Sequence, residues 1–136
     1  PDLQKVLKDD PNVKLVVKDF PILGPMSRAI SLAAVAVSDI APEKYEEFHY
    51  ALLKQTPRNK EQIIQSAGKL GINEDALRKA MDDETKYGDI LEANLELGQK
   101  VGVRGTPAFI INGKFVRGAV SASEFKREIK AARNKS

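Results

Sequence analysis

Residues 101–117 read VGVRGTPAFIINGKFVR, and within this stretch the sequence changes from a helical to a strand-like pattern. Two short strand-like runs, 108–111 and 115–117, flank Asn112–Gly113. Asn-Gly is the dipeptide that best suits a two-residue type I′ turn, because both of its residues tolerate a positive φ. We therefore predict an antiparallel β-hairpin in this part of the chain.

Shorter patterns on either side predict three further elements. Apolar residues at helical spacing predict a helix over 2–9, and the β-branched run in 12–20 predicts a strand buried on both faces that stops at Pro21. Ser121 and Glu124 form a capping-box pattern that begins a final helix. The apolar face of that helix should contact the sheet through Phe125, Ile129 and Ala132.

The region from residue 25 to residue 101 has a helical pattern throughout. Pro25 and Pro42 suit first helical positions, Asn59 and Asn73 suit N-caps, and Gly71 suits a left-handed helix end. Four or five helices fit this region. Their expected core faces are Ile30, Ala33, Ala34 and Val37; Tyr45, Phe48 and Leu52; Ile63, Ala67 and Leu70; and Ile90, Ala93, Leu97 and Val101.

The composition is that of one globular domain and excludes several classes of function. The chain has 136 residues and a net charge of +3, and its lysines alternate with acidic residues, so we expect neither nucleic-acid binding nor a membrane surface partner. No apolar run approaches the roughly 18 residues that span a bilayer. With no cysteine and one histidine, we predict no metal site and no cofactor.

Two sequence stretches resemble one known family. Residues 101–113, VGVRGTPAFIING, resemble the cis-proline loop and hairpin of DsbA-like thioredoxin-fold proteins. Residues 16–24, VVKDFPILG, are similar to the strand-to-insertion junction of the subgroup that includes the 27 kDa outer-membrane and suppressor-of-copper-sensitivity types. Tyr45, Phe48 and His49 match a K-Y-x-x-F-H run of that subgroup.

The resemblance implies an α/β thioredoxin fold with an inserted helical subdomain. Residues 1–20 and 102–136 would be the thioredoxin parts of a single partial domain 1–136, and 25–101 would be the insertion. The family's first strand and the start of its active-site helix, which carries Cys-x-x-Cys, would lie before Pro1. We therefore expect that these residues do not complete the thioredoxin sheet by themselves.

The resemblance also assigns the candidate site. Without the resemblance, we would expect Pro107 to be a trans proline at the start of a strand, because few X–Pro bonds in folded proteins are cis. The family pattern instead makes Thr106 and Pro107 the cis-proline loop beside the disulfide, where the Thr106 backbone pairs with an extended substrate. Gly105 would allow close approach of the substrate and Arg104 would contact it.

Three further groups of ionisable residues are candidates for a functional role. His49, on a helix, is interpreted as a packing residue, because the sequence offers no nucleophile for it to activate. Lys18 and Asp19 follow the predicted strand, where they could tune a thiol pKa, but a solvated strand end is the favoured interpretation. Asp82, Asp83 and Glu84 are expected at a helix N-terminus and not at a metal.

The implied function is thiol–disulfide exchange on proteins of the cell envelope, as oxidase or isomerase, by an intact periplasmic protein, and this chain alone would be redox-inactive. Its partners would be proteins with cysteines or disulfides and, as an option, a membrane redox protein. Whether this chain is an enzyme stays open, because it lacks the catalytic cysteines. The alternatives are a redox-inactive peptide-binding module and a DsbA-like enzyme that uses glutathione with serine in place of cysteine.

Overall fold

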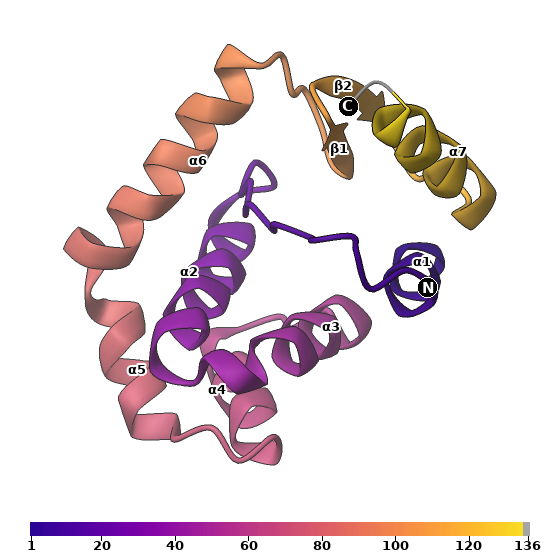
Figure 1. Ribbon diagram of the computed structural model, residues 1–136. Helices are drawn as coiled ribbons and strands as arrows, with labels where there is room; N and C mark the ends of the chain where they lie inside the picture. The colour runs from indigo at the N-terminus through magenta and orange to yellow at the C-terminus, as the bar shows by residue number, and fades with distance from the viewer. Residues whose placement is uncertain (135–136) are drawn as a thin grey trace. The chain divides into compact units, whose positions relative to one another are not determined.

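A computed structural model describes residues 1–134, which form two compact units. The helical unit spans Asp19–Val101. The mixed unit contains Pro1–Lys18 and the chain from Gly102 onward, so it is made of two segments that are distant in sequence. Figure 1 shows the course of the chain through both.

Helix α2 (Pro25–Ile40) is the centre of the helical unit and contacts most of its other helices. Because α2 is covered on several sides, its residues 31–37 are all buried, whereas a surface helix would bury one stripe only. The surrounding elements are η1 (Pro42–Lys44), α3 (Tyr45–Gln55), α4 (Lys60–Lys69), α5 (Glu74–Asp82), the π-helical turn η2 (Glu84–Gly88) and α6 (Asp89–Lys100).

The starts of these helices confirm the predicted capping. Pro25 occupies the first turn of α2. The side chain of Asn59 accepts a hydrogen bond from the Gln62 N–H at 2.9 Å, and Asn73 accepts one from the Ala76 N–H at 2.8 Å. Gly71 follows α4 with φ +78°, the left-handed conformation that glycine adopts without steric cost. Local sequence therefore sets where these helices begin and end.

The predicted apolar face of α6 is wrong. Ile90, Leu97 and Val101 are 43%, 46% and 41% exposed, whereas Leu91 is fully buried. The buried face is Leu91, Asn94 and Gly98, one position away from the predicted stripe. The other three predicted faces do contribute to the core, which is lined by Leu32, Ala33, Val37, Phe48, Leu52, Ile63, Ile64, Ala67, Leu77 and Leu91 with Ile30, Tyr45 and Leu70 packed against it.

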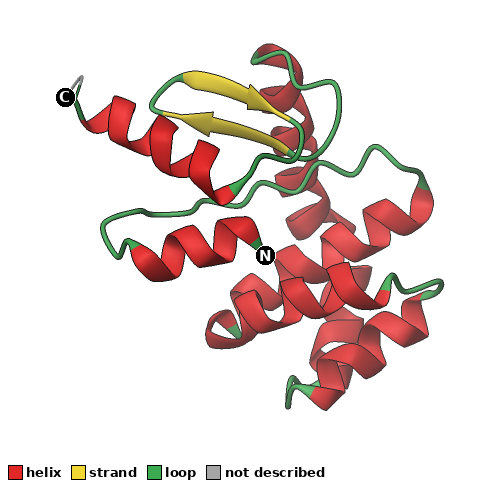
Figure 2. Ribbon diagram, turned by 90° about the vertical axis from the view of Figure 1, so that its right-hand side faces the viewer, coloured by secondary structure: helices red, strands yellow, loops and turns green. Residues whose placement is uncertain are grey.

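The mixed unit contains a β-hairpin and two helices. Strands β1 (Ala108–Ile111) and β2 (Lys114–Arg117) pair antiparallel, with Ala108 opposite Arg117 (Figure 2). Asn112 and Gly113 have φ values of +47° and +79°, which confirms the predicted type I′ turn. Helix α1 (Asp2–Asp9) contacts α7 (Ala122–Arg133), and α7 contacts β1.

Helix α7 begins as predicted, and Phe125 of its predicted apolar face contacts the hairpin, whereas Ile129 lines the groove between α1 and α7. Ser121 and Glu124 form the capping box, since the Ser121 hydroxyl accepts from the Glu124 N–H and the Glu124 carboxylate accepts from the Ser121 N–H. The ring of Phe125 meets that of Phe109 edge to face, with centroids 4.8 Å apart. This contact fixes α7 on one face of the hairpin.

The predicted strand over 12–20 is not formed in the described part of the chain. Residues 13–20 have no regular secondary structure, and β1 and β2 are paired only with each other. Leu15 and Val16 are 39% and 63% exposed, so this run is not buried on both faces. A strand requires a neighbouring backbone to pair with, and the apolar sequence of this run does not supply one.

Within residues 1–134, no helix has both the length and the apolar character needed to cross a bilayer.

Candidate functional site

The loop that leads into β1 brings the four predicted site residues together. Gly102, with φ +81°, ends the helical stretch, and the Thr106–Pro107 peptide bond is cis. The Pro107 carbonyl accepts a hydrogen bond of 2.9 Å from the Gly118 N–H, just beyond the end of β2. The last residue of the loop is thereby tied to the hairpin, which gives the loop a defined position on the mixed unit.

All of this loop from Arg104 to Pro107 lies on the surface. A Cβ placed on Gly105 would have no atom within 4 Å, so the backbone there is open to an approaching chain. Thr106 forms no hydrogen bond with the residues that the structure describes, which leaves its N–H and C=O available. The arrangement therefore presents free backbone groups next to the start of a strand.

The hairpin that follows the loop packs against α7 on one face and is exposed to solvent on the other. Phe109 contacts Phe125, whereas its neighbour Ile110 is 54% exposed. On β2, the Arg117 guanidinium lies over the Phe115 ring at 5.3 Å from its centroid. Successive side chains of a strand point to opposite faces, so Ile110 lies on the face of the hairpin opposite to Phe109 and is exposed there.

A second polar cluster, in the helical unit, was not predicted as a site. It consists of Asp19, Ser31 of α2, and Tyr45 and His49 of α3. Burial raises the pKa of Asp19, while the charge of His49 and the Ser31 hydroxyl partly offset that effect. Burial and the nearby Asp19 carboxylate raise the pKa of Tyr45 to about 12. The cluster therefore favours the protonated forms of two of its acids.

The interpretation of Lys18 and Asp19 as a solvated strand end is corrected for Asp19. Lys18 is exposed, but Asp19 is partly buried and turned toward the helical unit. No local pattern indicated this partial burial, since Ile22 and Leu23 of the apolar run that follows Asp19 are 43% and 79% exposed. His49 packs as predicted, stacked on Tyr45 with ring centroids 5.7 Å apart.

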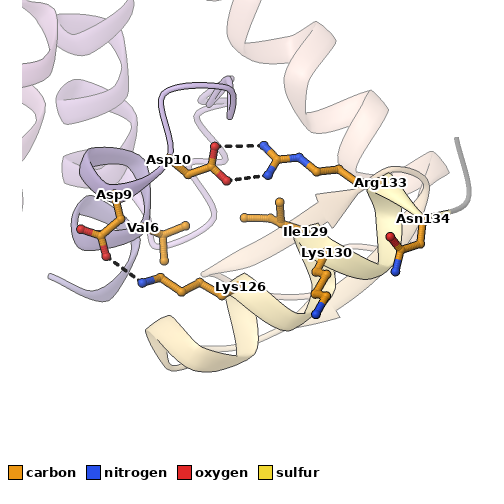
Figure 3. Close-up of a pocket in the computed structure, with 8 residues that line it drawn as sticks. All are labelled: Val6, Asp9, Asp10, Lys126, Ile129, Lys130, Arg133 and Asn134. Carbon is orange, nitrogen blue, oxygen red and sulfur yellow. Dashed lines mark hydrogen bonds and ion pairs between the residues drawn. The ribbon is translucent and has the colours of Figure 1, made fainter.

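A groove of about 340 Å³ lies between α1 and α7 of the mixed unit (Figure 3). Val6 and Ile129 provide its apolar wall, and ion pairs cross it. The Lys126 ammonium donates to Asp9 at 2.7 Å, and the Arg133 guanidinium binds Asp10. Asp9, Asp10, Lys126 and Arg133 are therefore paired with one another across the contact between the two helices.

Among residues 1–134, no group of three or more histidine, aspartate or glutamate side chains is placed to hold a metal ion. Asp83 instead accepts a hydrogen bond of 3.0 Å from the Lys86 N–H at the start of η2, as its predicted position at a helix N-terminus requires.

The chain is similar in sequence to one family model and one curated protein. The model, described as a DSBA-like thioredoxin domain, matches residues 26–130. Disulfide bond formation protein D of Bacillus subtilis is 26% identical over 137 residues, which cover 95% of this chain and 61% of that protein. The chain thus spans about three-fifths of the curated relative that it matches.

Three solved structures resemble the chain over nearly its whole length. A thioredoxin-like oxidoreductase from Silicibacter pomeroyi is 30% identical with a TM-score of 0.89, covering 99% of this chain and 77% of its own. ScsC of Proteus mirabilis in a compact conformation is 26% identical with a TM-score of 0.86 and coverages of 99% and 74%. A periplasmic thioredoxin-like protein from Salmonella enterica serovar Typhimurium is 28% identical, with a TM-score of 0.85 and coverages of 97% and 73%.

Proposed function

The chain belongs to the family of DSBA-like thioredoxin domains, and from that premise we propose that it is the substrate-binding part of a thiol–disulfide oxidoreductase. Its fold is the DsbA-like thioredoxin fold with an inserted helical subdomain. The family and the similar structures support a function of the thiol–disulfide oxidoreductase type.

The observation that carries the proposal is the free backbone at Thr106. This residue is exposed, lies directly before Pro107 and β1, and has no hydrogen-bond partner in the described structure. An extended peptide that runs beside it can donate to its C=O and accept from its N–H, as a strand added to a sheet does. Thr106 and Pro107 therefore contact the substrate backbone in this proposal.

The neighbouring residues have supporting roles. Gly105 leaves room for the substrate chain, because nothing lies within 4 Å of the place where its side chain would be. Arg104 is exposed and has no ion pair in residues 1–134, so its guanidinium can contact an acidic or carbonyl group of the substrate. The room at Gly105 and a carbonyl contact of Arg104 do not depend on the substrate sequence, whereas a contact of Arg104 with an acidic group would favour acidic substrates.

Thiol–disulfide exchange itself needs a thiolate, which the 136 residues do not contain. The exchange proceeds by attack of a thiolate on a disulfide sulfur through a mixed disulfide. In this proposal the cysteine pair belongs to another part of the natural protein, and the loop holds the substrate disulfide against it. The substrates in this proposal are periplasmic proteins with cysteines or disulfides. A membrane redox protein returns the cysteine pair to its starting redox state after each exchange.

The test compares two substitutions in the natural gene product that contains this sequence. Gly105→Val fills the open space beside Thr106, and Ala131→Val makes a similar change on the exposed face of α7. We expect Gly105→Val to lower the rate of insulin reduction at least several-fold without a change in thermal midpoint, and Ala131→Val to change neither.

Two results would overturn the proposal. A folded Gly105→Val variant with the wild-type rate would show that the loop does not approach the substrate. Absence of disulfide exchange in the wild-type protein, with peptide binding at Thr106 retained in an amide-shift titration, would identify a redox-inactive binding module instead.

A further inference from the structure

The two units carry charges of opposite sign. In residues 1–18 and 102–134, the described part of the mixed unit, eleven lysines and arginines outnumber five aspartates and glutamates. The helical unit, Asp19–Val101, has ten lysines and arginines and fourteen aspartates and glutamates. The net charge of the chain is a small +3 because these two opposite charges nearly cancel. The unit that contains the Thr106 loop is therefore strongly basic.

Within the mixed unit, the loop and the hairpin contain no acidic residue. Residues 101–120 include Arg104, Lys114 and Arg117 and no aspartate or glutamate. The charge of Lys114 is compensated, because its ammonium lies 2.6 Å from the Glu128 carboxylate of α7. Arg104 and Arg117 are exposed and form no ion pair within residues 1–134. Two guanidinium groups of this stretch are thus left without a carboxylate partner in the described chain.

Arg117 lies beside the end of the loop. It is paired in the hairpin with Ala108, the residue that directly follows Pro107. The next residue, Gly118, donates its N–H to the Pro107 carbonyl at 2.9 Å. These two backbone links bring Arg117 next to the cis proline, although it comes ten residues later in the sequence. Arg117 was not predicted as a site residue, because its position depends on the register of the hairpin.

The Arg117 side chain lies on the face of the hairpin that α7 leaves uncovered. Directly opposite residues of an antiparallel pair point to the same face, so Arg117 shares a face with Ala108. Phe109, the next residue of β1, points to the other face and contacts Phe125 of α7. The Arg117 guanidinium lies over the Phe115 ring, 5.3 Å from its centroid. This contact restricts a long side chain on an exposed face, while its charge stays unpaired in the described chain.

We propose that Arg104 and Arg117 select substrates in which aspartate or glutamate flanks the reacting cysteine. The inference rests on the proposed function, in which an extended substrate chain runs beside Thr106. Arg104 is two residues before Thr106, and Arg117 adjoins Pro107, so one guanidinium is near each end of the Thr106–Pro107 peptide. A guanidinium group binds a carboxylate through two parallel hydrogen bonds. Neither arginine has to break an ion pair of the described chain to form that contact.

The arrangement of charges favours an acidic peptide over a nucleic acid. Nucleic-acid binding depends on many contacts between basic side chains and successive phosphates. The loop and the hairpin offer two unpaired cations, and two basic residues of α7, Lys126 and Arg133, are already paired with Asp9 and Asp10. The open space at Gly105 also suits the backbone of an extended peptide. A short segment with a few carboxylates matches both features.

The expected preference is moderate and depends on salt. An exposed ion pair contributes little, which corresponds to roughly 1.5- to 5-fold in binding affinity for each arginine. The two arginines together should therefore favour an acidic peptide over a neutral one by roughly 2- to 25-fold. Because the charges are exposed, salt screens them, and the preference should decrease as the ionic strength rises.

The experiment measures the binding of three labelled peptides to the natural protein that contains this sequence, by fluorescence anisotropy. Each peptide has serine in place of the reacting cysteine, flanked on both sides by glutamate, glutamine or lysine. We expect the glutamate peptide to bind most tightly and the lysine peptide most weakly, with smaller differences at high salt. Arg104→Gln and Arg117→Gln should each lower the affinity ratio of the glutamate to the glutamine peptide, and Arg117→Lys should retain more of that ratio than Arg117→Gln.

Arg58→Gln is the matched control, because it removes an exposed arginine of the helical unit that has no ion pair in the described chain, and the ratio should not change. Equal affinities of the glutamate and glutamine peptides for the wild-type protein at low salt overturn the inference, as does a ratio that survives both site substitutions together. A DNA oligonucleotide of the same net charge that binds as tightly as the glutamate peptide overturns it in favour of general polyanion binding.

The proposed redox function is tested separately with the cysteine form of the glutamine peptide. Absence of exchange with this neutral peptide counts against the redox function. The comparison of the serine peptides still decides the charge preference, because binding of those peptides requires no thiol reaction.

Discussion

Asp10 and Arg133, at opposite ends of the sequence, bind each other through two parallel hydrogen bonds. The Arg133 Nη1 donates to Asp10 Oδ2 at 2.7 Å and Nη2 donates to Oδ1 at 3.0 Å (Figure 3). Lys126 and Asp9 add a second ion pair, and the Asp2 carboxylate accepts from the Ala122 N–H at 3.2 Å at the other end of the helices. Helix α1 is thus fastened to α7 at both of its ends.

Replacing Arg133 by lysine should weaken this attachment. A lysine cannot form the two-pronged contact, so Arg133→Lys is expected to lower the thermal midpoint slightly at neutral pH. Hydrogen bonding to Arg133 lowers the pKa of Asp10, so this stabilisation is present above 3.8 and is lost as the pH falls through the lower pKa of the folded state. Thermal unfolding at several pH values measures both effects. Arg58→Lys, which removes no ion pair of the described chain, should cause no change.

The seat of Phe20 on Gly98 predicts the effect of adding one methyl group. Gly98→Ala places a Cβ 2.5 Å from the ring, and the forced displacement should cost about 1–3 kcal/mol of unfolding free energy. Gly105→Ala is the control, because nothing lies within 4 Å of its Cβ and its φ is not positive. Denaturant titration compares the two. A second substitution, Phe20→Leu, should recover part of the loss, and a neutral Gly98→Ala variant would contradict the close contact.

Two leucines of α6 test the corrected orientation of that helix. Leu91 is fully buried, so Leu91→Ala should lower the unfolding free energy by about 2–5 kcal/mol. Leu97 is 46% exposed, and Leu97→Ala should change it by no more than roughly 0.5 kcal/mol. Chemical denaturation of both variants gives the comparison. The reverse order of effects would restore the face that the sequence pattern predicted.

Thr56 is a branched residue in a conformation that suits glycine. It ends α3 with φ +46° and ψ +67°, the left-handed region, where its Cβ is crowded. Thr56→Gly should therefore raise the unfolding free energy by about 1 kcal/mol. Thr85, in the π-helical turn, is the matched control, and glycine there should lower stability because it adds backbone freedom to the unfolded chain. Equal effects at both positions would argue against strain at Thr56.

Sequence patterns predicted most of the local structure. The Asn112–Gly113 turn, the caps at Asn59 and Asn73 and the Ser121–Glu124 capping box are all present as expected. Each of them depends on hydrogen bonds or backbone conformations within about four residues, and these are encoded where they occur. The resemblance of residues 101–113 also located the Thr106–Pro107 loop, whose cis bond the structure contains. The role of that loop remains a prediction.

The polar cluster around Asp19 shows what local patterns miss. Asp19 and His49 are thirty residues apart, and neither has a neighbour in sequence that indicates a shared environment. Their interaction exists because α2 and α3 pack together beside the entering segment. A carboxyl group at the end of an apolar run is equally compatible with solvent, so only its surroundings decide its ionisation.

By itself, the sequence indicated the family, the caps of several helices and the hairpin of this protein, because capping groups, turn residues and short motifs act over a few positions. The tertiary structure alone decided which stripe of α6 is buried, since Leu91 packs into the core of the helical unit and Gly98 lies against the Phe20 ring. It also decided that residues 13–20 remain unpaired. Burial and strand pairing are properties of a residue together with its neighbours in space, and those neighbours come from distant parts of the chain.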